Sequence, residues 1–398
     1  MEEKFDVLKA LKETFQTVFG NTEGVRYYFA PGRVNLIGEH TDYNGGHVFP
    51  CALTVGTYGA ARLREDKQIR LYSLNRAMNG ISFSSVEDLR PLTGEQSWTN
   101  YIRGVVWSMQ NRNYEFDTGF EMVIYGDIPA GAGLSSSASL EVLTGYVLTD
   151  LYHFPTSGPE LAIIGQDAEN NFCGLSCGIM DQFASAMGEE DHALFLDTAT
   201  LQYESVPLNL KGAKILITNT NVKHSLVDSE YNERRRQCAQ ALADLQTVTD
   251  IRSLGELTCD RFDKLMALIP DETNRRRAKH AVYENARATE AVRVLKEGDL
   301  AAFGKLMNAS HVSLRDDFET SCREADILAE AAWEIPGVYG SRITGGGFGG
   351  CTVSIVRDEA TEEFRTKLSE RYQKETGKTC DFYEVRAGMG PHVLDGPA

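Results

Sequence analysis

The sequence predicts an α+β fold, in which strands and helices follow one another without a regular order. The two-residue alternation of apolar side chains that is typical of strands occurs in this chain, and so does the 3.6-residue spacing of amphipathic helices. These patterns do not form the repeating strand–helix–strand units that predict a doubly wound parallel sheet. A chain of 398 residues, 42% of them hydrophobic and 24% charged, can bury a large core of this mixed kind.

The first half of the chain is predicted to place strands and helices around its glycine-rich segments. Residues 5–18 carry apolar side chains at helical spacing, and short strands are expected between residues 27 and 71. Asn44-Gly45-Gly46 is a turn signal within that stretch. The remaining elements expected in this half are a helix over about 101–110, a strand over 120–125, helices over 139–152, 158–172 and 178–187, and a strand over 192–197.

The second half is predicted to be mainly helical. A strand over 214–218 precedes a helical run over about 225–335. The elements expected after it are a buried strand over 351–356, a helix over about 360–376 and a short strand over 381–385. We place a domain boundary between residues 200 and 215, which divides the chain into domains 1–205 and 206–398.

Charge and cysteine content narrow the range of partners and compartments. A formal net charge of −17 argues against a nucleic acid or an anionic membrane as the main partner. The N-terminal residues lack the apolar region of a secretion signal, and no segment approaches the ~18 apolar residues of a membrane span. The eight cysteines are scattered, and Cys173 and Cys177 lack the further ligands of a metal site. We therefore expect a cytoplasmic protein with reduced thiols.

The most informative segment is the glycine- and serine-rich run Gly126–Ser139, called the glycine–serine loop or phosphate loop below. Its small residues let the backbone approach an anion closely, and its N–H groups can surround a phosphate. The serines precede an apolar pattern that predicts a helix, whose N-terminus favours negative charge. The run lacks the lysine of a Walker A loop and the third glycine of a dinucleotide fingerprint. It therefore predicts a triphosphate-binding loop of another kind.

A second glycine-containing segment, Pro31–Gly46, concentrates polar side chains. Arg33, Glu39, His40 and Asp42 all lie within it. An arginine can screen a transferring phosphoryl group, while carboxylates and an imidazole can hydrogen-bond several sugar hydroxyls. The alternative interpretation is a polar turn between two strands.

The third segment, Thr344–Cys351, formally contains the spacing G-x-G-x-x-G. A strand-like run follows it instead of a helix, so the context of a dinucleotide site is missing. Taken alone, this segment predicts a tight loop between two elements. Beside the other two segments it becomes a candidate wall of the phosphate site.

Together the three segments resemble the three signatures of the GHMP kinases, a superfamily of sugar and metabolite kinases, and Pro31–Asp42 is similar to the signature of the galactokinases in particular. Further segments share the resemblance, which runs from near the N-terminus to beyond residue 350: Trp98–Gly104, Cys177–Gln182, Ser229–Asn232 and Arg315–Phe318. It implies two α+β domains with the active site in the cleft between them. The implied reaction is ATP-dependent phosphorylation of the anomeric hydroxyl of α-D-galactose, the first phosphorylation step of galactose breakdown by the Leloir pathway.

The resemblance implies that Asp181 and Arg33 are catalytic. Asp181 would accept the proton of the anomeric hydroxyl or orient that oxygen, and Arg33 would steady the aspartate and the transferring phosphoryl group. A carboxylate is a weak base for an alcohol, so positioning and electrostatics must supply most of the rate. The sugar-binding residues that the resemblance implies are Glu39, His40, Thr41, Asp42 and Tyr231.

The resemblance also implies a Mg²⁺ cofactor, with ATP as co-substrate. Ser137 and Glu169 match the magnesium ligands and offer hard oxygen donors, although an acidic residue at this place could also belong to a solvated helix face. Ser73 is expected near the nucleotide, and Trp98 is either an adenine-stacking surface or a core residue. The expected phosphate-loop residues are Gly131, Ala132, Gly133, Leu134, Ser135, Ser136 and Ser137.

Two alternatives to a galactose kinase stay open. The first is an N-acetylgalactosamine kinase, which depends on the space around the 2-position of the sugar. The second is a regulator that binds galactose and ATP without efficient catalysis. Such regulators lack a Ser-Ala pair in the glycine–serine loop, and Ser137-Ala138 is present here. We expect a monomer whose partners are the small molecules galactose and ATP, with neither nucleic acid nor membrane.

Overall fold

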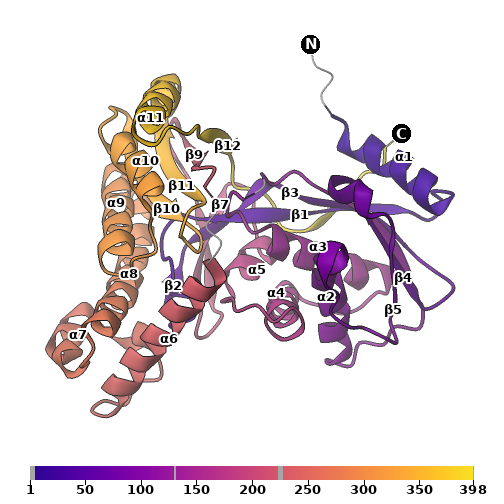
Figure 1. Ribbon diagram of the computed structural model, residues 1–398, viewed down its shortest axis with the longest axis horizontal. Helices are drawn as coiled ribbons and strands as arrows, with labels where there is room; N and C mark the ends of the chain where they lie inside the picture. Colours follow the sequence, from indigo (N-terminus) through magenta and orange to yellow (C-terminus); the bar gives the residue numbers. More distant parts are fainter. Residues whose placement is uncertain (1–4, 130, 223–226, 398) are drawn as a thin grey trace.

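The computed structural model describes residues 5–129, 131–222 and 227–397. These residues form two α+β parts that lie side by side (Figure 1). Within the described ranges, no helix combines the length and the apolar composition needed to cross a membrane.

The N-terminal part is built on a mainly antiparallel sheet with the strand order β13-β1-β3-β6-β4-β5, in which β4 and β6 are parallel. Its strands are β1 (Arg26–Asn35), β3 (Pro50–Leu63), β4 (Gln68–Ser73), β5 (Ser82–Ser85), β6 (Phe120–Gly126) and β13 (His392–Leu394). Because β13 pairs with β1, the end of the chain returns to the sheet of the N-terminal part.

Helices cover both faces of this sheet (Figure 1). One face carries α1 (Val7–Phe19), whose Leu11 and Phe15 pack against Val123 of β6. The other face carries a larger apolar cluster shared with the remaining helices of this part. These are α2 (Asn100–Gln110), α3 (Ser136–Leu151), α4 (Gly158–Asp167) and α5 (Met180–Ala186).

The C-terminal part has its own antiparallel sheet, with the order β10-β11-β9-β12. Its strands are β9 (Ala213–Asn219), β10 (Val338–Thr344), β11 (Cys351–Arg357) and β12 (Asp381–Val385). A smaller sheet has the order β2-β7-β8 and joins β2 (His47–Val48), which lies between β1 and β3 in the sequence, to β7 (His192–Asp197) and β8 (Tyr203–Pro207).

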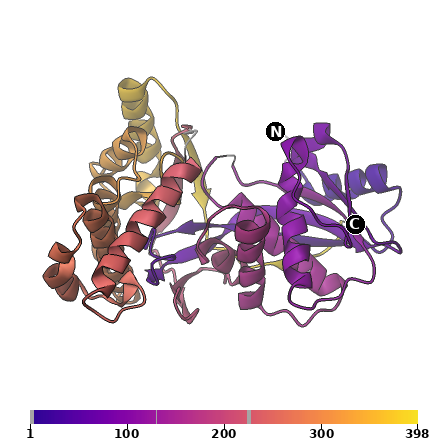
Figure 2. The same cartoon turned by 60° about the horizontal axis from the view of Figure 1, so that its bottom comes forward.

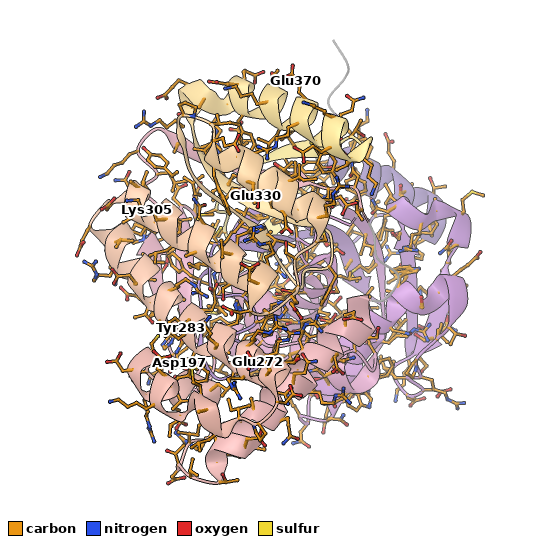
Figure 3. The ribbon with its side chains drawn as sticks, turned by 60° about the vertical axis from the view of Figure 1, so that its left-hand side comes forward. Asp197, Glu272, Tyr283, Lys305, Glu330 and Glu370 are labelled. Atoms are coloured by element: carbon orange, nitrogen blue, oxygen red, sulfur yellow. The ribbon has the colours of Figure 1, made fainter. Side chains whose placement is uncertain are left out.

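Long helices form the outer side of the C-terminal part (Figure 3). They are α6 (Val227–Gln246), α7 (Cys259–Leu265), α8 (Glu272–Lys296), α9 (Leu300–Asp316), α10 (Arg323–Trp333) and α11 (Thr361–Thr376). Short helical turns complete the inventory: η1 (Leu74–Asn79), η2 (Gly94–Thr99), η3 (Ala168–Phe172), η4 (Leu254–Glu256), η5 (Met266–Leu268) and η6 (Asp358–Ala360). Figures 1 and 2 show one end of α6 close to the middle of the molecule.

An apolar core shared by the two parts holds them together. Val34 of β1 and Leu134 of the glycine–serine loop belong to the same buried cluster as Ile217 of β9 and Val353 of β11. The cluster also contains residues of α8 and α9. The first two glycine-rich segments are therefore packed against the C-terminal part, which positions the polar residues that they carry.

The α+β prediction is confirmed, and several elements coincide with the predicted ones. The strand expected over 192–197 has these bounds, and the expected helical run is observed from residue 227, while residues 225 and 226 lie outside the described range. The helix expected over 158–172 differs, because it ends as the π-helical turn η3, which carries Glu169. The division at residue 205 stays a prediction.

Strands β5, β8, β10 and β13 were not predicted. β8 is largely exposed and β13 has three residues, so neither carries the apolar alternation that identifies a strand. β10 contains Gly340, Ser341 and Arg342, which interrupt the apolar alternation although all three are buried.

Candidate active site

A cavity of about 420 Å³ is lined by residues of two glycine-rich segments, Pro31–Gly46 and Thr344–Cys351. The segment Gly126–Ser139 contacts two of the lining residues, Arg33 and Asp181. The cavity is lined by residues of both parts, which agrees with the expected place of the site. The lining residues are Arg33, Glu39, His40, Asp42, Glu169, Gly174, Leu175, Ser176, Cys177, Gly178, Met180, Asp181, Tyr231, Asn232, Gly345 and Gly346.

Arg33 and Asp181 form a bidentate ion pair in this cavity. Arg33 follows a register shift in β1, and Asp181 lies in the first turn of α5. The Nε and Nη2 atoms of Arg33 each donate to an Asp181 oxygen at 2.7 Å, and Nη1 donates to the carbonyl of Gly133 at 2.7 Å. Burial opposes the charge on Arg33, but Asp181, with Glu39 and Asp42, outweighs it and raises the pKa of the guanidinium. This geometry fixes the orientation of the carboxylate.

The glycine–serine loop approaches the same carboxylate from the other side. Gly131 and Gly133 have φ values of 74° and 66°, and Ser135, at 59°, is also left-handed. Ser135 is the N-cap residue of α3, yet its hydroxyl donates to Asp181 instead of capping the helix. The loop and the N-terminus of α3 therefore lie against Asp181 and Arg33. A helix N-terminus favours a negatively charged group.

Glu39 connects the first glycine-rich segment to the third. Its Oε1 atom accepts hydrogen bonds from the Gly345 N–H at 2.8 Å and from the Thr344 hydroxyl at 3.1 Å. The guanidinium of Arg342, which is fully buried, lies 3.2 Å from the same oxygen. The carboxylate is thus held in place while it lines the cavity.

His40 offers an unsatisfied nitrogen at the cavity. Its backbone is left-handed, with φ at 62°, and its Nδ1 atom lies 2.8 Å from the hydroxyl of Tyr43. Burial lowers the pKa of His40 well below its usual value, so the ring is neutral. The Nε2 atom is buried without a hydrogen-bond partner among the described residues. A ligand hydroxyl would satisfy it.

Asp42 lies directly against the backbone of Gly178. A Cβ atom at Gly178 would fall 1.7 Å from Asp42 Oδ2, so a residue with a side chain would displace the carboxylate. Burial raises the pKa of Asp42 to about 6, and the carboxylates of Asp181 and Glu39 add to the shift. Ionised Asp42 is a strong acceptor for a hydroxyl group in this setting.

The other two residues expected at the sugar occupy different places. Tyr231, near the start of α6, lines the cavity with its ring 5.6 Å from that of His40. Thr41 is fully buried and is absent from the described lining of the cavity. Its hydroxyl lies within hydrogen-bond distance of the carbonyls of Gly38 and His47, at 2.8 and 2.7 Å, so it holds the turn that carries its neighbours.

Ser137 and Glu169, the expected magnesium ligands, are hydrogen-bonded to each other. Gln182 Nε2 donates to Glu169 Oε2 at 2.7 Å. Burial raises the pKa of Glu169, and the charge of Asp181 acts in the same direction. A hydroxyl and a carboxylate with hard oxygens, next to a phosphate loop, fit Mg²⁺, which takes its remaining ligands from phosphates and water.

The residues expected at the nucleotide are not among the described residues that line the cavity. Ser73 is the last residue of β4 and pairs with Ile124 of β6, the strand that leads into the glycine–serine loop. Neither Ser73 nor residues 131–137 belong to the described lining of the cavity. Trp98 is packed in the apolar core of the N-terminal part with 8% of its surface exposed, which favours the core interpretation.

Some contributors to the site were not predicted. Gly178 lies within Cys177–Gln182, one of the segments that share the family resemblance. The sequence does not show that a side chain at this position would displace the Asp42 carboxylate. Gln182, the residue after Asp181, bridges Glu141 and Glu169 with its amide nitrogen. Arg342 could have been noticed as a charge in a predominantly apolar segment.

Models of known families match three regions of the chain. Residues 13–63 match the galactokinase galactose-binding signature, residues 100–189 the N-terminal domain of GHMP kinases, and residues 291–374 the C-terminal domain of GHMP kinases. The matches confirm the fold predicted from the three glycine-rich segments.

Curated relatives extend the similarity to nearly the whole chain. The galactokinase of Bacillus subtilis strain 168 is 52% identical over 386 residues, which cover 97% of this chain and 99% of that protein. The chain belongs to the galactokinase family. The galactokinase of Clostridium acetobutylicum is 50% identical, over 98% of this chain and the full length of that protein.

A solved member of the galactokinase family has nearly the same structure. The crystal structure of Lactococcus lactis galactokinase complexed with galactose matches with a TM-score of 0.96 and 47% identity, covering 98% of this chain and all of that one. A mevalonate kinase structure matches with a TM-score of 0.63 at 18% identity over 92% of this chain, and so shares the fold.

Proposed function

We propose that this member of the galactokinase family transfers the terminal phosphoryl group of ATP to the anomeric hydroxyl of α-D-galactose, giving α-D-galactose 1-phosphate and ADP. The Arg33–Asp181 pair carries the proposal, because it lies between the candidate sugar residues and the glycine–serine loop. A phosphoryl acceptor and a phosphoryl donor would meet there. The reaction would supply the first phosphorylated intermediate of galactose breakdown.

Each group at the cavity has a part in the proposed reaction. Asp181, held by Arg33 and Ser135, orients the anomeric hydroxyl and takes its proton. Arg33 stabilises the charge that develops on the transferring phosphoryl group. Glu39, His40 and Asp42 accept hydrogen bonds from, or donate them to, the other sugar hydroxyls.

Ser137 and Glu169 would hold Mg²⁺, which neutralises phosphate charge when it is bound. The backbone N–H groups of residues 131–137 would bind the phosphates of ATP, and Ser73 would lie near the nucleotide. We also propose a cytoplasmic monomer. The eight cysteines are all free thiols, which supports a reducing compartment.

An assay of ADP release with a panel of sugars tests the function. Galactose is expected to give turnover, while glucose, with an equatorial 4-hydroxyl, leaves buried polar groups unpaired and gives a kcat/KM at least ~100-fold lower. N-Acetylgalactosamine and a sample without sugar complete the panel. A higher kcat/KM for N-acetylgalactosamine than for galactose would replace the proposed substrate. Binding of galactose and ATP without turnover would favour the regulator.

Replacing Glu169 with glutamine should weaken the dependence on magnesium. The amide keeps the shape but loses the charge that attracts the cation, so the half-saturating Mg²⁺ concentration should rise ~10-fold or more. The measurement is a Mg²⁺ titration of the rate at saturating galactose and ATP. The exposed Glu290 on α8 provides a control, since Glu290→Gln should not move the curve. Identical curves for Glu169→Gln and the parent would exclude Glu169 as a ligand.

The affinity for galactose should fall in mildly acidic solution. The pKa of Asp42 is raised to about 6, so its carboxylate is ionised above this pH and becomes protonated below it. Because only the ionised form is a full acceptor, the KM for galactose should rise as the pH falls through 6, by more than the KM for ATP. Asp42→Asn should have a raised KM that no longer shows this rise. If the KM for galactose of Asp42→Asn still rose below pH 6 as in the wild type, a group other than Asp42 would cause the pH dependence.

A further inference from the structure

Helix α8 contacts the backbone of the turn that presents Glu39 and His40. Two of its residues, His280 and Glu284, are one helical turn apart and therefore lie on the same face. Both are fully buried, and neither lines the cavity within the described residues. Their contacts run from the C-terminal part to the N-terminal part of the molecule.

The side chains of His280 and Glu284 hydrogen-bond to the backbone carbonyl and the backbone N–H of Glu39, respectively. Glu284 Oε1 accepts hydrogen bonds from the N–H groups of Gly38 at 2.9 Å and Glu39 at 3.3 Å. His280 Nε2 lies 3.1 Å from the carbonyl oxygen of Glu39, so this nitrogen carries the proton and donates. The N–H and the C=O of Glu39 are thus both held by α8.

Further contacts fix the two side chains themselves. The Nδ1 atom of His280 lies 2.9 Å from the Ser313 hydroxyl, which must donate because Nε2 is the protonated nitrogen. Glu284 accepts from the Ser310 hydroxyl at 2.6 Å and from Arg287 Nε at 2.6 Å. Burial opposes the charge on Glu284, but Arg287, Arg342 and the other groups around the carboxylate together outweigh it and hold its pKa at about 2. Burial lowers the pKa of His280 to about 4, so its ring stays neutral.

The turn adopts a backbone conformation that residues with a side chain rarely take. Gly38 has a φ of 97°, and a Cβ atom there would lie 2.7 Å from the carbonyl oxygen of His47. His40, two residues later, is also left-handed, a conformation that costs free energy in a residue with a side chain. External hydrogen bonds are therefore needed to keep Glu39 and His40 directed at the cavity.

From these contacts we propose that His280 and Glu284 are positioning residues for sugar recognition: they hold the Gly38–His40 turn so that Glu39 and His40 meet the sugar. The inference rests on the proposed function. It predicts that loss of either residue weakens the binding of galactose while the binding of ATP is retained, because within the described residues the hydrogen bonds of both side chains reach this turn and not the glycine–serine loop.

The test measures the binding of galactose and of ATP separately by calorimetry. His280→Ala removes the donor to Glu39 and should weaken galactose binding ~10-fold, and Glu284→Ala should weaken it by at least as much. Glu284→Gln keeps one oxygen acceptor and should have a smaller effect. The dissociation constant for ATP should stay within ~2-fold in all variants, since the phosphate loop is not altered.

Arg277 supplies a matched control on the same helix. It is also buried and donates to Gln237, to the carbonyl of Asp317 and to Glu319, and among the described residues none of its hydrogen bonds reaches the turn. Arg277→Ala should lower the melting temperature without changing the affinity for galactose more than ~2-fold. If Glu284→Ala does not fold, the galactose affinities of His280→Ala and Glu284→Gln are compared with that of Arg277→Ala instead.

Three results would overturn the inference: unchanged galactose binding in His280→Ala and Glu284→Gln, an equal loss of ATP binding, or the same loss of galactose binding in Arg277→Ala. A parent protein that does not bind galactose would instead overturn the proposed function. The two failures are therefore distinguishable.

Discussion

Asp181→Asn should lower kcat by ~10²–10⁴-fold, the range that a positioned acid–base group contributes. The amide keeps the size of the carboxylate but cannot take the proton of the anomeric hydroxyl. It also presents an NH₂ group to Arg33 or Ser135, where the carboxylate now accepts hydrogen bonds on both oxygens. The interaction lost is one that matters most in the transition state, so kcat should fall while galactose and ATP still bind.

The measurement is a steady-state rate for Asp181→Asn and Asp181→Ala beside calorimetric binding of each substrate. Because 28% of the Asp181 side chain is exposed, the substitutions should leave the fold intact, which a melting curve checks. A kcat equal to that of the parent in both variants would remove Asp181 from the catalytic residues.

Arg33→Lys should lower kcat by ~10²–10³-fold although it keeps the positive charge. The guanidinium donates to both oxygens of Asp181 and to the carbonyl of Gly133 at once. A single ammonium group cannot reproduce this planar fork, so the carboxylate and the glycine–serine loop lose their common support.

Comparing kcat of Arg33→Lys with that of Arg33→Ala separates the contribution of the positive charge at position 33 from that of the planar guanidinium. If geometry dominates, the two variants are similarly slow. A lysine variant with nearly the parent rate would show that Arg33 acts only as a diffuse charge. The Arg26–Asp150 pair, which lies outside the cavity, offers a control, since Arg26→Lys should leave the rate unchanged.

The residues of this site that could be predicted are those that lie close together in the sequence, within one short segment. Arg33, Glu39, His40 and Asp42 lie within ten residues, and the spacing of glycines and serines before an apolar helix predicts a phosphate loop from local backbone geometry. Asp181 differs, because its catalytic role is implied by the family resemblance of Cys177–Gln182 and not by the chemistry of that segment alone.

The contacts that orient these residues could not be predicted, because they join distant parts of the chain. Glu39 and Gly345 are 306 positions apart, and Gly38 and Glu284 are 246 apart. Such pairs follow from the packing of the C-terminal part against β1, which no local periodicity encodes. The π-helical turn that places Glu169 beside Ser137 is likewise absent from a pattern of helical spacing.

The most direct test of the account is the identity of the product made from ATP and galactose. Phosphorus and proton nuclear magnetic resonance of the reaction mixture distinguishes the position and the anomeric configuration of the new phosphate ester. We predict a phosphate whose phosphorus couples to the anomeric proton of α-D-galactose, formed in step with ADP. A phosphate on another hydroxyl, or ADP formed without a sugar phosphate, would contradict the assignment of Asp181 and Arg33 to the anomeric oxygen.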